Sequence, residues 1–106
     1  IQQPRNLAYG AGQWRRFRED MMDLAQERLS ILRAAAEQRR RDEMIYQINI
    51  DNFTLALAEI GGSEDPDLVV FAKELRERLA GEKAQQARES ILLKVIERQL
   101  ACSTSS

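Results

Sequence analysis

The chain has 106 residues, a length at which one domain is expected and about two-thirds of the unfolded surface can be buried. Its 16 basic and 17 acidic residues nearly cancel, which excludes a strong global attraction to nucleic acid. The single cysteine, Cys102, excludes an internal disulfide and favours a cytoplasmic setting, and no apolar run approaches the roughly 20 residues that a membrane span needs. We therefore expect one domain that makes no membrane contact.

The first segment, residues 1–12, contains Pro4, Gly10 and Gly12 and shows no sustained hydrophobic periodicity. Prolines and glycines at such spacing are typical of irregular backbone. The sequence therefore predicts an extended N-terminal arm over residues 1–12.

A long helix is predicted from Gln13 to Ile60, because neither glycine nor proline interrupts this range and helix-forming residues fill it. Apolar residues recur at steps of three and four through Trp14, Phe17, Met21 and Leu24, as one face of a helix requires. Residues 37–43 are seven polar residues in a row, which indicates a stretch that faces solvent or a partner.

The end of this helix carries a heptad pattern, in which apolar residues are separated by 4, 3, 4 and 3 positions. These residues are Tyr46, Ile50, Phe53, Leu57 and Ile60. Residues 45–50 also alternate partly as a strand would, so an edge strand stays open as the alternative for that short range.

Gly61 and Gly62 predict the end of the first helix, and Asp65 followed by Pro66 predicts the start of the next one. Gly81 is a candidate C-terminal cap, after which a last helix is expected from about residue 82 to residue 100. The domain is thus expected over residues 13–101 with a break at 61–65, followed by a flexible tail over 102–106.

The predicted fold is all-α: a long N-terminal helix with a C-terminal helical hairpin folded back on it, as in a helical bundle or coiled coil. The second half of the chain is too short to cover every apolar face of the first, so we expect a homo-oligomer or a partner helix. The candidate interface residues are Trp14, Phe17, Met21, Met22, Ile31, Tyr46, Ile50, Phe53, Leu57 and Ile60.

Seven arginines in the N-terminal half are candidate contacts for an anionic partner. They are Arg5, Arg15, Arg16, Arg18, Arg39, Arg40 and Arg41. Neighbouring acidic residues offer a simpler interpretation, in which these arginines form helix-surface pairs and face solvent.

No motif for catalysis, metal binding or nucleotide binding is present, and histidine, the commonest general base and metal ligand, is absent. We expect no enzyme activity, no cofactor and no metal. The preferred hypothesis is a helical interaction module, an adaptor, regulator or assembly factor that acts as a homo-oligomer and binds a protein. The alternative is a nucleic-acid-associated regulator that uses the basic N-terminal end and Arg39 to Arg41.

Overall fold

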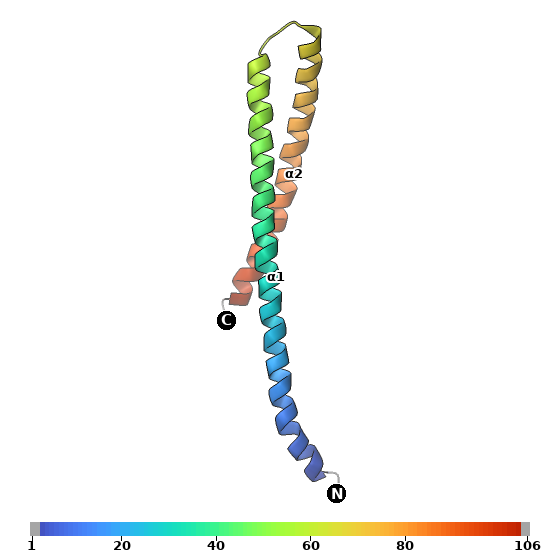
Figure 1. The fold of residues 1–106 in the computed structure, drawn as a ribbon, viewed down its shortest axis with the longest axis vertical. Helices are drawn as coiled ribbons and strands as arrows, with labels where there is room; N and C mark the ends of the chain where they lie inside the picture. The colour runs from blue at the N-terminus through green and yellow to red at the C-terminus, as the bar shows by residue number, and fades with distance from the viewer. Residues whose placement is uncertain (1–2, 105–106) are drawn as a thin grey trace.

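The computed structural model describes the backbone of residues 3–104 and the side chains of residues 12–103. Over that part of the chain it contains two helices and no strand: α1 spans Gln3–Ile60 and α2 spans Pro66–Thr104. The helices run antiparallel as one hairpin, and the N-terminal part of α1 projects beyond the end of α2 (Figure 1). The molecule measures 95 × 24 × 14 Å, and the all-α prediction is confirmed.

The turn between the helices follows from local backbone chemistry. Gly61 has a φ of +58°, a left-handed conformation that glycine adopts without steric cost, and its N–H donates to the Leu57 carbonyl at 3.0 Å. At the other end of the turn, the Asp65 carboxylate accepts a hydrogen bond of 3.0 Å from the Asp67 N–H and so caps α2. The break therefore lies at the glycines and the capping aspartate that the sequence marks.

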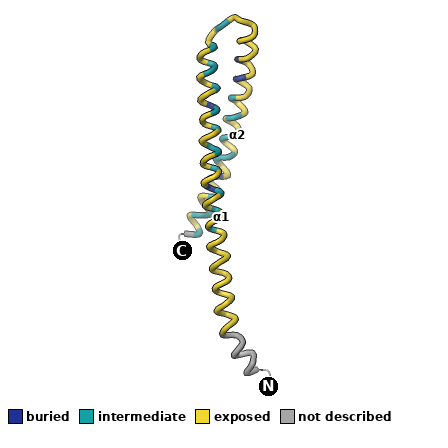
Figure 2. Tube along the Cα trace, in the orientation of Figure 1, coloured by how far each residue is buried: buried dark blue, intermediate teal, exposed yellow. Residues whose placement is uncertain are grey.

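The core is a single line of residues on each helix, spaced by three and four positions and facing the other helix; we call it the inner stripe. On α1 it comprises Leu29, Leu32, Ala36, Arg39, Glu43, Tyr46, Ile50, Phe53, Leu57 and Ile60; on α2 it comprises Ala72, Leu75, Leu79, Glu82, Gln86, Glu89, Leu93, Ile96, Leu100 and Ser103. All are buried or half-buried, and Figure 2 shows such positions as bands that alternate with exposed ones where the two helices are paired. Such a narrow core buries little of each helix.

Two predicted boundaries are wrong at the N-terminal end and in the second half. The backbone is already helical from Gln3, where an extended arm was expected, because glycine costs a helix only about 1 kcal/mol relative to alanine. A proline near the first turn is tolerated, since its missing N–H would have no partner within the helix. Likewise α2 passes through Gly81 without a positive φ, so the chain forms one hairpin of two helices.

Two further ranges are helical. Residues 45–50 belong to α1, so the helical interpretation is confirmed and the edge strand is excluded. The last turn of α2 includes Cys102 to Thr104, which the sequence placed in a flexible tail. Both results reflect the inner stripe, because its spacing of three and four continues without a break through Ile50 on α1 and to Ser103 on α2.

Candidate interaction surface

Polar residues occupy the middle of the inner stripe and fix how the two helices align. The Arg39 guanidinium donates to the Glu89 carboxylate at 2.5 Å, and these two side chains are 32% and 16% exposed. On neighbouring turns Asn49 donates to Glu82 at 3.4 Å, and Gln86 donates to Gln47 at 2.9 Å. Polar groups at core positions specify register at some expense of stability, so these contacts define the antiparallel alignment.

The Arg39 to Arg41 cluster, a predicted anionic-partner site, is divided among three environments. Arg39 is engaged by Glu89 inside the hairpin, and Arg40 forms a 3.3 Å ion pair with Glu97 on its flank. Arg41 is exposed and makes no hydrogen bond or ion pair within the described part of the chain. Only Arg41 is therefore fully available to a partner.

The basic N-terminal cluster is more open. Arg15, Arg16 and Arg18 are all exposed, and no hydrogen bond or ion pair holds them within the described residues. Arg5 lies outside the residues whose side chains the structure describes. The structure thus presents three unengaged arginines on one turn of the projecting part of α1.

The heptad residues at the end of α1 are used within the chain. Ile50 is buried, and the others are half-buried against α2; these are Tyr46, Phe53, Leu57 and Ile60. Although the sequence offers all five as candidate interface residues, their visible role is the contact between α1 and α2.

A second line of residues on α1, also spaced by three and four positions, runs beside the inner stripe. We call it the outer stripe. Its members are Trp14, Phe17, Met21, Leu24, Arg28, Ile31, Ala35, Gln38, Asp42 and Ile45. The six large apolar members are 50–65% exposed. Ala35 and Asp42 are half-buried beside α2, whereas the large apolar members are left uncovered by the hairpin.

The outer stripe begins on the projecting segment, residues 12–27, which is exposed throughout (Figure 2). The Trp14 and Phe17 rings meet edge to face with centroids 5.9 Å apart, and they remain 65% and 54% exposed. Met22 lies beside the stripe on the continuation of the inner stripe and is 65% exposed. No part of α2 extends far enough to cover this segment (Figure 1).

Sequence reasoning missed several members of this exposed face. Leu24 and Ile45 were not among the candidate interface residues, although the 3–4 spacing that links Trp14 to Ile45 was available in the sequence. On α2, Leu92 and Val95 are 43% and 48% exposed and follow the same helical edge as Gln99. Their position could not be predicted, because it depends on the pairing of the two helices.

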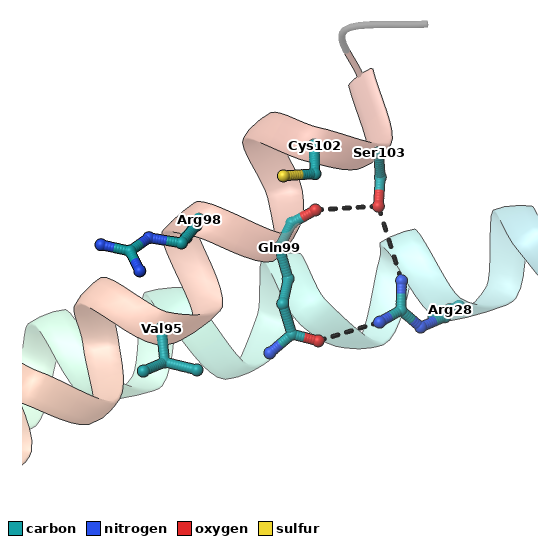
Figure 3. A pocket seen from close by; sticks show the side chains of 6 residues that line it. All are labelled: Arg28, Val95, Arg98, Gln99, Cys102 and Ser103. Atoms are coloured by element: carbon teal, nitrogen blue, oxygen red, sulfur yellow. Dashed lines mark hydrogen bonds between the residues drawn. The ribbon is translucent and has the colours of Figure 1, made fainter.

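A shallow groove of about 390 Å³ marks the place where α2 ends against α1 (Figure 3). The Arg28 guanidinium bridges the helices there, donating to the Gln99 side-chain oxygen at 2.8 Å and to the Ser103 hydroxyl at 3.5 Å. Val95 and Cys102 supply its apolar wall. Because Arg28 belongs to the outer stripe, the groove continues that exposed face onto α2.

The exposed apolar side chains of the outer stripe are suited to packing against another helix, and the exposed arginines are suited to ion pairing. Among the described residues no three histidine, cysteine, aspartate or glutamate side chains gather as a metal site would require. None of the described helices combines the length and hydropathy needed to cross a membrane. Comparison with protein-family models, with curated proteins and with solved structures found no match for this chain.

Proposed function

We propose that this chain is a non-enzymatic helical interaction module, an adaptor, regulator or assembly factor, that acts as a homo-oligomer with coiled-coil packing and binds a protein partner. The observation that carries the proposal is the outer stripe, whose six large apolar side chains are half or more exposed. Four of them, Trp14, Phe17, Met21 and Leu24, follow one another without a polar member between them, and a soluble monomer rarely exposes such a patch. The cytoplasmic setting stays part of the proposal, on the strength of the single cysteine.

The total surface supports the same proposal. The chain exposes 8713 Å², whereas a compact monomer of 12.2 kDa is expected to expose about 6,100 Å². Its radius of gyration is 26.3 Å, about twice the roughly 13 Å of a compact domain of this length. An elongated hairpin exposes more surface for its shape alone, but a hairpin with polar outer faces would not expose tryptophan and phenylalanine.

The oligomer is tested by sedimentation equilibrium at micromolar concentration. Because one chain weighs 12.2 kDa, a dimer has a mass of 2 × 12.2 = 24.4 kDa. Phe17→Asp places a charge in the outer stripe and should give a folded protein that associates weakly or not at all. The matched control is Leu55→Asp, since Leu55 is 64% exposed and lies off the stripe.

Two results would contradict this part of the proposal. A wild-type monomer at every accessible concentration would exclude self-association and leave the exposed face to another protein. Equal loss of association in Phe17→Asp and Leu55→Asp would mean that the outer stripe has no special role.

The second candidate function is binding to nucleic acid, and the three exposed arginines at residues 15, 16 and 18 favour it. Phosphate contacts release counterions, so such binding must weaken steeply as salt rises. A titration of duplex DNA and of RNA between low and physiological salt therefore separates the candidates. Tight, salt-sensitive binding that is lost when Arg15, Arg16 and Arg18 are replaced by glutamine would favour this second function.

A further inference from the structure

The charges along α1 repeat in the same order at two places beside the outer stripe. Near its start, Arg15, Arg16 and Arg18 are followed by Glu19 and Asp20; near its end, Arg39, Arg40 and Arg41 are followed by Asp42 and Glu43. The two blocks lie 24 residues apart, about 36 Å along the helix. Because both run from basic to acidic, a second α1 laid antiparallel places the acidic part of one block opposite the basic part of the other.

The same alignment brings some of the apolar positions of the outer stripe together. When two copies of α1 overlap antiparallel about a twofold axis near residues 29 and 30, residues whose numbers add to 59 lie at the same level. Trp14 of one copy then faces Ile45 of the other, and Leu24 faces Ala35, so at these levels a large apolar side chain meets a smaller one. The other three pairs of the outer stripe are mixed, each with one apolar and one polar member: Phe17 with Asp42, Met21 with Gln38, and Ile31 with Arg28.

Asp20 and Arg41 then lie on the same edge of the outer stripe, within about 3 Å of the same level. Both side chains are exposed, and neither makes a hydrogen bond or ion pair within the described part of the chain. The symmetry of the overlap produces this pair twice. Two unengaged opposite charges are thereby brought together at each end of one apolar surface.

The polar members of the outer stripe are compatible with burial because they already have partners. Arg28 donates to Gln99 at 2.8 Å, and Gln38 donates to Asp42 at 3.0 Å. Each therefore enters the overlap with at least one hydrogen bond, which reduces the cost of about 1–3 kcal/mol that a wholly unpaired buried group carries.

The area is sufficient for a stable contact. Six large apolar side chains that are 50–65% exposed offer about 600 Å² per copy, if each has roughly 150–250 Å² to bury. Stable interfaces bury about 800 Å² per partner, and Leu92 and Val95 of α2 extend the same edge. The overlap thus reaches the size of a specific interface without any change in the hairpin.

We propose that a second copy of this chain packs antiparallel along the outer stripe, with Asp20 of each copy paired to Arg41 of the other. This inference rests on the proposed self-association and adds its geometry. The projecting segment of each copy, residues 12–27, is covered by the hairpin of its partner.

Charge reversal tests the pairing by sedimentation equilibrium. Asp20→Arg and Arg41→Glu should each weaken the dimer about tenfold, because each breaks two ion pairs and creates two like-charge contacts. The double variant Asp20→Arg/Arg41→Glu should return to within about threefold of the wild type. Lys73→Glu is the matched control, because Lys73 is exposed on α2 near the tip of the hairpin and should leave association unchanged.

The direction of the copies is tested independently by fluorescence energy transfer. A donor and an acceptor attached at Glu64→Cys in a Cys102→Ser background lie at the hairpin tips, which the antiparallel overlap separates by about 100 Å. No transfer is expected there. Labels at the native Cys102, level with Arg28 and close to the twofold axis, should give strong transfer.

The outcomes separate this geometry from the broader proposal. Strong transfer between tip labels, or a double charge variant as weak as the single variants, overturns the antiparallel pairing while leaving self-association intact. A wild-type chain that stays monomeric overturns both.

Discussion

The ion pair of Arg39 and Glu89 replaces an apolar layer in the middle of the hairpin, and replacing both residues by leucine should make the protein more stable. Glu89 is 16% exposed and Arg39 is 32% exposed, so the pair is partly withdrawn from water. Exposed ion pairs contribute about 0.2–1 kcal/mol, whereas replacing a buried pair by apolar residues is often neutral or stabilising by about 1–4 kcal/mol. The burial of the Arg39–Glu89 pair lies between that of a fully exposed pair and that of a fully buried one.

The expected magnitude follows from that burial. A fully buried leucine contributes about 1.5–3 kcal/mol, and roughly half is expected for each leucine in a layer that solvent still reaches. After about 1 kcal/mol is subtracted for the lost ion pair, Arg39→Leu/Glu89→Leu should raise the free energy of unfolding by about 0.5–2 kcal/mol. With a urea m-value of about 1–2 kcal/mol/M, the midpoint should rise by about 1 M.

The assay is urea denaturation followed by far-ultraviolet circular dichroism, at several protein concentrations because association also stabilises the fold. The matched control is Arg40→Leu/Glu97→Leu, which removes an ion pair whose side chains are 53% and 47% exposed. That control should change stability by less than about 0.5 kcal/mol.

The opposite result would refute the reasoning. If the double leucine variant unfolds at lower urea than the wild type, then the polar layer stabilises the hairpin and register is not its main contribution. We also expect the leucine variant to become polydisperse in sedimentation, because a polar layer no longer restricts which helices pair and in what alignment.

Further variants test the hairpin itself, each by the same urea denaturation. Gly81→Ala should stabilise by about 1 kcal/mol, because its Cβ would meet nothing within 4 Å, while Gly61→Ala should destabilise by about 1–2 kcal/mol at a φ of +58°; a gain at Gly61 would mean that the turn is wrongly described. Asp65→Ala should cost about 1 kcal/mol by removing the cap on α2, and an unchanged midpoint would contradict that role. Phe53→Asp should cost about 3–5 kcal/mol, because it charges a half-buried position between the helices, and a fully stable variant would place Phe53 outside the core.

The sequence by itself determines the helical class and the break between the helices. Spacing of three and four positions from Tyr46 to Ile60 is local information, and it decides helix over strand without reference to any partner. Gly61 and Asp65 form hydrogen bonds with backbone groups only a few residues away, so the turn can also be predicted from the sequence. The length of α2 was harder to predict from the sequence. Gly81 destabilises a helix only slightly, and the packing of the inner stripe on both sides of it keeps α2 continuous.

Only the tertiary structure decided which apolar face is covered. Trp14 and Tyr46 look equivalent in the sequence, since both begin a run of apolar residues with helical spacing. The hairpin covers Tyr46 and leaves Trp14 65% exposed, because α2 ends level with Arg28 and lies on one side of α1. That choice depends on the length of α2 and on long-range pairs such as Arg39 with Glu89, which the order of residues along one helix does not contain.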